Sequence, residues 1–295
     1  MSHLPPGYGA DGHLHLDDSI HPVVLTDFDV DKYVKNARGR IPVSASGLTM
    51  TPRTARDLAF LWRLEVAALG EMRSLLISWT GNEPRITAFL ATWAYERYWL
   101  ARAERDLLTA AGGTLPVPAG RSLTVRARGA YIDKGLPLTS PLVGSVVGEA
   151  VTAGHMARMA VQEGALRAAL DALRARLSGE ASDVVGEISR RRSDFVDFFR
   201  GEAAARVERS TAERMFALSM LGWPWAPFRA VGVADAAEVQ ALGSIFETPA
   251  AVADLEASDA AVGDLLPGRP TPALNLVRRA RRRRRPIPAR SSRGL

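Results

Sequence analysis

The sequence contains no cysteine among its 295 residues. This absence excludes disulfide bonds, iron–sulfur clusters, zinc sites built on thiolates and catalysis by a thiol. Histidine is also scarce, with five residues in the whole chain. Any bound metal would therefore need its ligands from His, Asp or Glu.

Other signals are missing as well. No apolar run reaches the length of a membrane span. The first residues lack a basic region followed by an apolar one, so the sequence predicts no signal peptide and a soluble, cytoplasmic protein. There is no P-loop, no glycine-rich dinucleotide turn and no Gly-x-Ser-x-Gly elbow. Nucleotide-dependent and serine-hydrolase chemistry are therefore poorly supported.

The positive charge is concentrated at one end of the chain. The formal net charge is +6, but Pro267–Leu295 contains ten Arg and neither Asp nor Glu, which leaves −4 for the preceding residues. Hydrophobic residues make up 47% of the sequence, which is enough for a sizeable core. The pattern predicts a mildly acidic folded body and a disordered, Arg-rich tail over residues 267–295.

The most regular stretch, Thr51–Gly112, predicts a helical hairpin. Apolar residues recur at helical spacing on both sides of a short breaker, Thr80–Pro84. Thr51 is a candidate N-cap followed by proline, and Pro84 has the same place at the start of the second limb. Helices are also expected at Ser140–Leu177, Ser182–Glu208, Thr211–Leu221, Ala234–Ile245 and Pro249–Leu265.

Each of the four long helices has one charged residue within its apolar stripe. These residues are Glu65, Glu96, Glu163 and Arg192, in chain order. A carboxylate on the buried face of a helix is costly unless it is paired or bound to metal. Any one of these Glu could instead lie at the edge of the core and reach water. The four together favour a polar site inside the protein.

Four long helices with a short first connection and a longer middle one predict an all-α four-helix bundle, with a looser helical array as the alternative. The expected units are an extended N-terminal arm (residues 1–50), the bundle (51–222), short C-terminal helices packed on it (223–266) and the basic tail (267–295).

These patterns resemble the ferritin-like superfamily, in particular bacterial di-iron oxidase-like proteins. The resemblance is carried by Glu65 in LWRLEVAALGEM, Glu96 in WAYERYW, Glu163 in HMARMAVQEGALRAAL and the segment EISRRRSDFVDFF. Such bundles place one Glu on each of two helices and Glu-x-x-His on each of the other two. The resemblance implies a metal site at Glu65, Glu96 and Glu163, with Glu149 and His155 as further candidates.

The sequence departs from this family pattern where the histidines should stand. Trp99 lies three residues after Glu96, and Arg192 and Phe195 occupy the Glu-x-x-His positions of the fourth helix. Three buried carboxylates without metal would repel one another, and Arg192 could neutralise part of their charge. We therefore expect a degenerate di-iron site that has become a salt-bridge cluster. His155 is interpreted either as a replacement ligand near Glu149 or as a satisfied, partly buried histidine.

The densest charge run lies in the tail and comprises Arg278, Arg279, Arg281, Arg282, Arg283, Arg284 and Arg285. Such a run can bind nucleic acid or an anionic surface, or it can be solvated without a partner. The absence of interleaved aromatic residues argues against sequence-specific recognition.

Three functions follow as expectations. The first is a structural or interaction protein without a cofactor, pairing as a homodimer or heterodimer with a related, active bundle protein. The second is an Fe- or Mn-dependent oxidase or oxygenase with a reduced carboxylate site. The third is a protein associated with nucleic acid or an anionic surface through its Arg-rich tail.

Overall fold

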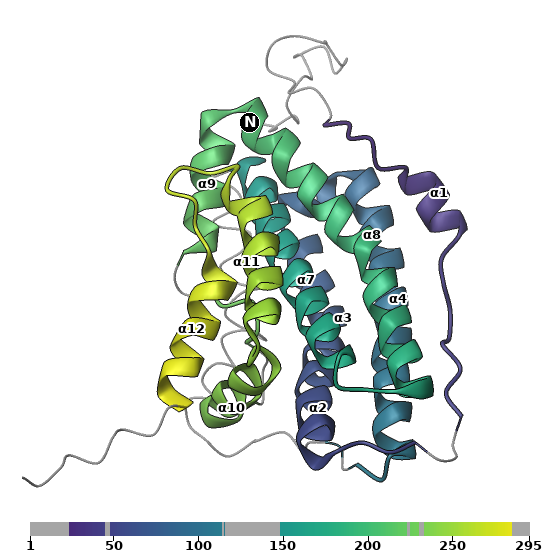
Figure 1. Ribbon diagram of the computed structural model, residues 1–295. Helices are drawn as coiled ribbons and strands as arrows, with labels where there is room; N and C mark the ends of the chain where they lie inside the picture. The colour runs from purple at the N-terminus through teal and green to yellow at the C-terminus, as the bar shows by residue number, and fades with distance from the viewer. Residues whose placement is uncertain are drawn as a thin grey trace, which may run out of the picture.

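The protein is all-α in the part of the chain that the structure describes. The computed structural model describes residues 24–44, 48–113, 115, 148–222, 225–229 and 233–284, and within these ranges it contains helices and no strand (Figure 1). The predicted all-α class is therefore confirmed. No helix in the described ranges combines the length and the apolar character that crossing a membrane requires.

The predicted hairpin is present, but its first limb is divided. Its elements are α2 (Pro52–Val66), α3 (Ala68–Leu76), the 3-10 helix η1 (Trp79–Asn82) and α4 (Pro84–Ala110). Thr51 caps α2, because its side chain accepts a hydrogen bond from the backbone N–H of Thr54. The first limb, expected to be continuous, is interrupted at Ala67. No proline or glycine stands there, so the sequence pattern gave no sign of the break.

The second half of the chain adds further helices. These are α7 (Ala150–Arg174), α8 (Gly179–Arg209), α9 (Thr211–Leu221), α10 (Asp235–Ile245) and α11 (Pro249–Gly263). The bounds of α9 agree with the prediction, since Ser210 caps the backbone N–H of Glu213 and Gly222 follows the last residue. The predicted start of the third long helix at Ser140 lies outside the described residues.

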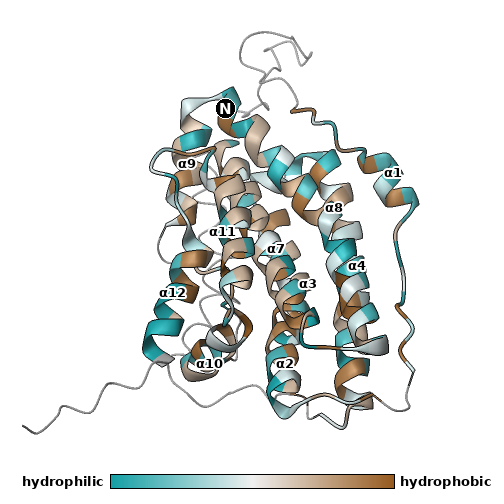
Figure 2. Ribbon diagram, in the orientation of Figure 1, coloured by the Kyte–Doolittle hydropathy of each residue, from teal (hydrophilic) through white to brown (hydrophobic). Residues whose placement is uncertain are grey.

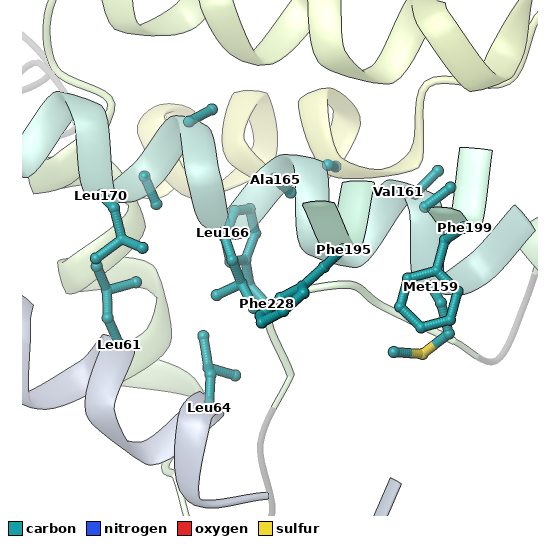
Figure 3. Close-up of a cluster of buried hydrophobic side chains, with 14 of the residues drawn as sticks. Leu61, Leu64, Met159, Val161, Ala165, Leu166, Leu170, Phe195, Phe199 and Phe228 are labelled. Carbon is teal, nitrogen blue, oxygen red and sulfur yellow. The ribbon is translucent and has the colours of Figure 1, made fainter. Parts of the chain in front are cut away.

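The helices pack against one another around a shared core. α2 contacts α4 and α7, and α8 also contacts α4 and α7 (Figure 1). α9 and α11 pack along α7, while α10 packs against α2. Figure 3 shows Leu61 and Leu64 of α2 together with Leu166 and Leu170 of α7 and with Phe195 of α8, all of them buried. Burying each such side chain contributes about 1.5–3 kcal/mol to folding.

The N-terminal segment packs on this body through aromatic residues. Asp29 caps the short helix α1 (Val30–Lys35) by accepting a hydrogen bond from the backbone N–H of Lys32. The rings of Phe28 and Phe198 of α8 lie 5.4 Å apart in an edge-to-face arrangement. Tyr33 stacks on Phe89 of α4 with 4.9 Å between the ring centroids. The segment thus lies across the seam between α4 and α8.

The expectation that the chain is disordered from Pro267 onward is wrong for its first part. Helix α12 spans Pro272–Arg284 and contacts α7, α10 and α11. Its apolar side is buried, through Ala273, Leu274, Val277 and Ala280. The run of Arg favours disorder, but these apolar residues recur at helical spacing and give the helix a face to bury.

Candidate charged core

Two arginines and two glutamates from four different helices meet in the interior. Arg192 of α8 forms ion pairs with Glu65 of α2 and Glu163 of α7. Arg97 of α4 donates from Nε to Glu65 at 2.7 Å, and its Nη1 lies 3.4 Å from Glu163. All four side chains are at most 1% exposed. Each carboxylate is therefore bonded to both guanidinium groups.

The outer side of this cluster is completed by a third carboxylate. Glu71 of α3 accepts from Arg97 Nη1 at 2.7 Å and from the side-chain amide of Gln162 at 2.5 Å. Its side chain is 27% exposed, so the cluster reaches the solvent on this side. The interruption of the first limb at Ala67 separates the helix that carries Glu65 from the helix that carries Glu71. Both carboxylates bond to the same arginine.

Further hydrogen bonds and an aromatic ring hold the side chains of Glu163 and Arg97 in place. The indole N–H of Trp93 donates to Glu163 at 3.1 Å, and Arg97 Nη2 donates to the carbonyl oxygen of Leu64 at 2.8 Å. The guanidinium carbon of Arg97 lies 5.0 Å from the centre of the Trp93 ring. These contacts satisfy buried polar atoms that would otherwise cost about 1–3 kcal/mol each.

Burial and ion pairing shift the pKa values of the cluster in opposite directions. Burial raises the pKa of Glu163, whereas Arg97 and the hydrogen bond from Trp93 lower it. Burial lowers the pKa of Arg192, but a guanidinium in contact with two carboxylates stays charged at neutral pH. The cluster is thus held by complementary charges, so removing one partner leaves its neighbours buried and uncompensated.

Glu96 lies in a different cluster, although the resemblance placed it with Glu65 and Glu163. Its carboxylate accepts from the backbone N–H of Arg38 at 2.7 Å and pairs with the guanidinium of Arg38 at 2.9 Å. Arg38 also bonds Asp194 of α8 at 2.6 Å. Successive residues of a helix point about 100° apart, so Arg97 faces α2 while Glu96 faces the N-terminal segment.

The structure does not bring Glu149 and His155 together. Glu149 precedes α7 and lies 3.4 Å from Arg209 of α8. The Nδ1 atom of His155 lies 2.8 Å from the hydroxyl of Thr80. Burial lowers the pKa of His155 to about 3, and the positive charge of Arg158 acts in the same direction. His155 is therefore a neutral, hydrogen-bonded residue at physiological pH.

Two further residues of α4, Arg97 and Glu104, are not among the site residues predicted from the sequence. Glu104 is fully buried, and neither carboxyl oxygen has a hydrogen-bond partner among the described residues. Burial raises the pKa of Glu104 to about 8, against a smaller opposing effect of Arg97. Both lie on the helix face of Trp93, at seven-residue spacing, which was the available signal.

The residues present do not fit a di-metal centre. Such a site uses carboxylate and imidazole ligands from four helices. Here Glu65 and Glu163 are engaged by two guanidinium groups and Glu96 by a third. Within the described ranges, no three residues of the types His, Cys, Asp and Glu are grouped so as to hold a metal ion.

The arginines predicted for the tail belong to α12 as far as the structure describes them. Four of them are exposed, namely Arg278, Arg279, Arg282 and Arg283, and Arg281 is half-buried. The side chain of Arg284 and the whole of Arg285 lie outside the part of the chain that the structure describes. The described arginines are separate from the charged core.

No protein-family model, no curated protein and no solved structure matches this chain.

Proposed function

We propose that this protein is a ferritin-like four-helix bundle in which two arginines take the place of the metal ions, and that it acts as a structural or interaction protein. The observation that carries the proposal is the position of Arg97 and Arg192. Each is bonded to both Glu65 and Glu163, at the point where α2, α4, α7 and α8 meet.

The packing of the four long helices supports the bundle. Each contacts two of the other three, in the ring α2–α4–α8–α7. One charged residue from each helix enters the same cluster. In di-metal bundles the inward-facing ligands also come from all four helices. The resemblance suggested by the sequence and this arrangement thus support the same proposal.

The charges support the loss of metal chemistry. A carboxylate cluster binds divalent metal because its oxygens carry negative charge and free lone pairs. Arg97 and Arg192 neutralise that charge permanently and donate hydrogen bonds to the same oxygens. The alternative, an Fe- or Mn-dependent oxidase built on Glu65, Glu96 and Glu163, would require three arginines to leave their partners, Arg38 among them.

Metal loading tests the proposal. The protein is purified without a histidine tag, incubated anaerobically with Fe²⁺ or Mn²⁺, separated from free metal and assayed by elemental analysis. The proposal predicts far less than one metal per chain and no Fe²⁺-dependent oxygen consumption. Two metals per chain, lost in Glu163→Ala while the fold is kept, would revive the oxidase.

Pairing with a related bundle protein, as homodimer or heterodimer, remains a prediction. Multi-angle light scattering of the purified chain measures its molar mass. A mass near 32 kDa, set by the chain mass of 31.8 kDa, would rule out a stable homodimer. Co-expression with a candidate partner would then be the test of the heterodimer.

A further inference from the structure

Helix α12 is fixed on the body by its apolar side. Ala273, Leu274, Val277 and Ala280 are each at most 2% exposed, and the helix packs against α10, α11 and α7. Asp259 of α11 also accepts a hydrogen bond from the backbone N–H of Leu274 at 2.8 Å, which anchors the first turn. The arginines that follow are therefore displayed from a positioned helix.

The opposite side of α12 carries four exposed arginines. Arg278, Arg279, Arg282 and Arg283 form two adjacent pairs, one helical turn apart. One turn rises about 5.4 Å, so the two pairs make a continuous basic face. Figure 2 shows the hydrophilic colour concentrated in the C-terminal half of α12, and Figure 1 places this helix at the margin of the molecule.

An exposed ion pair on this face contributes little to holding it in place. Arg278 lies 3.5 Å from Glu256, and both side chains are more than half exposed. An ion pair with this exposure contributes about 0–1 kcal/mol. Arg281 lies off the face, half-buried, and donates to the carbonyl oxygen of Glu247 at 3.3 Å.

We propose that the exposed arginines of α12 bind the phosphate backbone of nucleic acid without sequence preference. A guanidinium group pairs with phosphate in a planar, two-bond geometry, and phosphates are regularly spaced along a strand. The buried state of the apolar side argues against a helix that inserts into a membrane. Amphipathic helices that lie on membranes insert their apolar face, whereas α12 uses that face to dock on the body. This binding surface is independent of the charged core.

Fluorescence anisotropy of labelled nucleic acid with the full-length protein tests this surface. The probes are a duplex and a single strand of about 20 nucleotides of mixed sequence, long enough to span the four arginines. Four neutralised phosphates would lower the affinity for duplex by roughly 150-fold between 50 and 200 mM salt. The test variant carries R278Q, R279Q, R282Q and R283Q, and Gln preserves helix propensity.

A charge-matched variant provides the control. It carries R40Q, R73Q, R190Q and R200Q, four exposed arginines elsewhere on the protein. Both variants lower the net charge by four, and both keep every Arg after position 283. We expect the α12 variant to lose most of its affinity. The slope of its log binding constant against log salt concentration should be shallower than that of wild type by about three to four. The affinity of the control variant should stay within about threefold of wild type.

Three results would overturn the proposal: no binding at 50 mM salt, equal loss of affinity in both variants, or unchanged affinity in the α12 variant. Binding of the protein to vesicles that contain phosphatidylserine is measured in parallel. Binding to vesicles without binding to nucleic acid would assign the face to an anionic membrane surface and would also contradict the proposal. Circular dichroism spectra equal to wild type show that neither variant has lost its helices.

Discussion

Replacing Arg192 by methionine should be severely destabilising, because the residue neutralises two buried carboxylates at once. Arg192 is fully buried and pairs with Glu65 and Glu163, of which at most 1% is exposed. Methionine keeps most of the volume and removes the charge. Taking one partner from a buried ion pair costs about 3–5 kcal/mol, against a total stability of about 5–15 kcal/mol for a typical protein.

The assay is urea unfolding at pH 7, followed by circular dichroism and extrapolated to water. Arg190→Met is the matched control, since Arg190 lies two residues away on α8 but its side chain is 64% exposed and pairs only at the surface, with Glu187. That variant should lose no more than about 1 kcal/mol. A loss of less than about 1 kcal/mol in Arg192→Met, as expected for a surface pair, would show that Glu65 and Glu163 do not depend on Arg192 for neutralisation.

A second variant keeps the test interpretable if Arg192→Met does not fold. Adding Glu163→Gln removes one of the two carboxylates that Arg192 neutralises, so the double variant should be more stable than Arg192→Met alone by about 1–3 kcal/mol. The double-mutant cycle measures this coupling directly. Additive effects of the two substitutions would show that the residues act independently.

Four further predictions concern Glu104, His155 and Arg38. Glu104→Leu should stabilise the protein by about 1–3 kcal/mol at pH 7, because it removes a buried carboxyl without a hydrogen-bond partner; urea unfolding measures this, and destabilisation would contradict it. The pKa of Glu104 is raised in the folded state to about 8, so the folded state binds more protons above the ordinary pKa, and stability should fall by up to about 2 kcal/mol between pH 6.5 and 8. This fall should be smaller in Glu104→Gln, because Glu163, whose pKa is also raised by burial, remains. His155 has the opposite effect on the pH dependence of stability, because its folded pKa of about 3 lies below the ordinary value. Stability should therefore be lost as the pH falls below about 6.5, and the loss should be smaller in His155→Gln. Arg38→Gln should remove the ion pairs of the N-terminal segment with Glu96 and Asp194 while leaving its backbone hydrogen bond to Glu96, and should speed hydrogen exchange in residues 24–44; unchanged exchange would show that the aromatic contacts suffice.

Helix starts could be predicted from the sequence where a capping residue or a proline marks them. Thr51 and Pro84 mark helix starts because capping and a fixed φ angle act within a few residues. The mid-helix positions of Glu65, Glu163 and Arg192 likewise predicted one polar site, since residues at the middle of neighbouring long helices lie at similar depth.

The remaining features depend on packing that sequence patterns do not encode. Glu96 and Arg97 are neighbours in the chain, and only the rotation of α4 decides which of them faces α2. Glu104 shares the helix face of Trp93 and Arg97, but its full burial depends on the helices packed around that face. The order of α12 was hidden by its composition, because Leu274 and Val277 gain stability only through contact with other helices.

A crystal structure from crystals soaked in Fe²⁺ or Mn²⁺, with data collected at the absorption edge of the metal, would show whether arginine or metal neutralises Glu65 and Glu163. We expect electron density for the guanidinium groups of Arg97 and Arg192 between Glu65 and Glu163, and no anomalous peak within about 5 Å of these carboxylates, twice the length of a metal–carboxylate bond. Anomalous peaks bound to Glu65 and Glu163, with the arginines displaced, would contradict this expectation and would establish a metal centre in this protein.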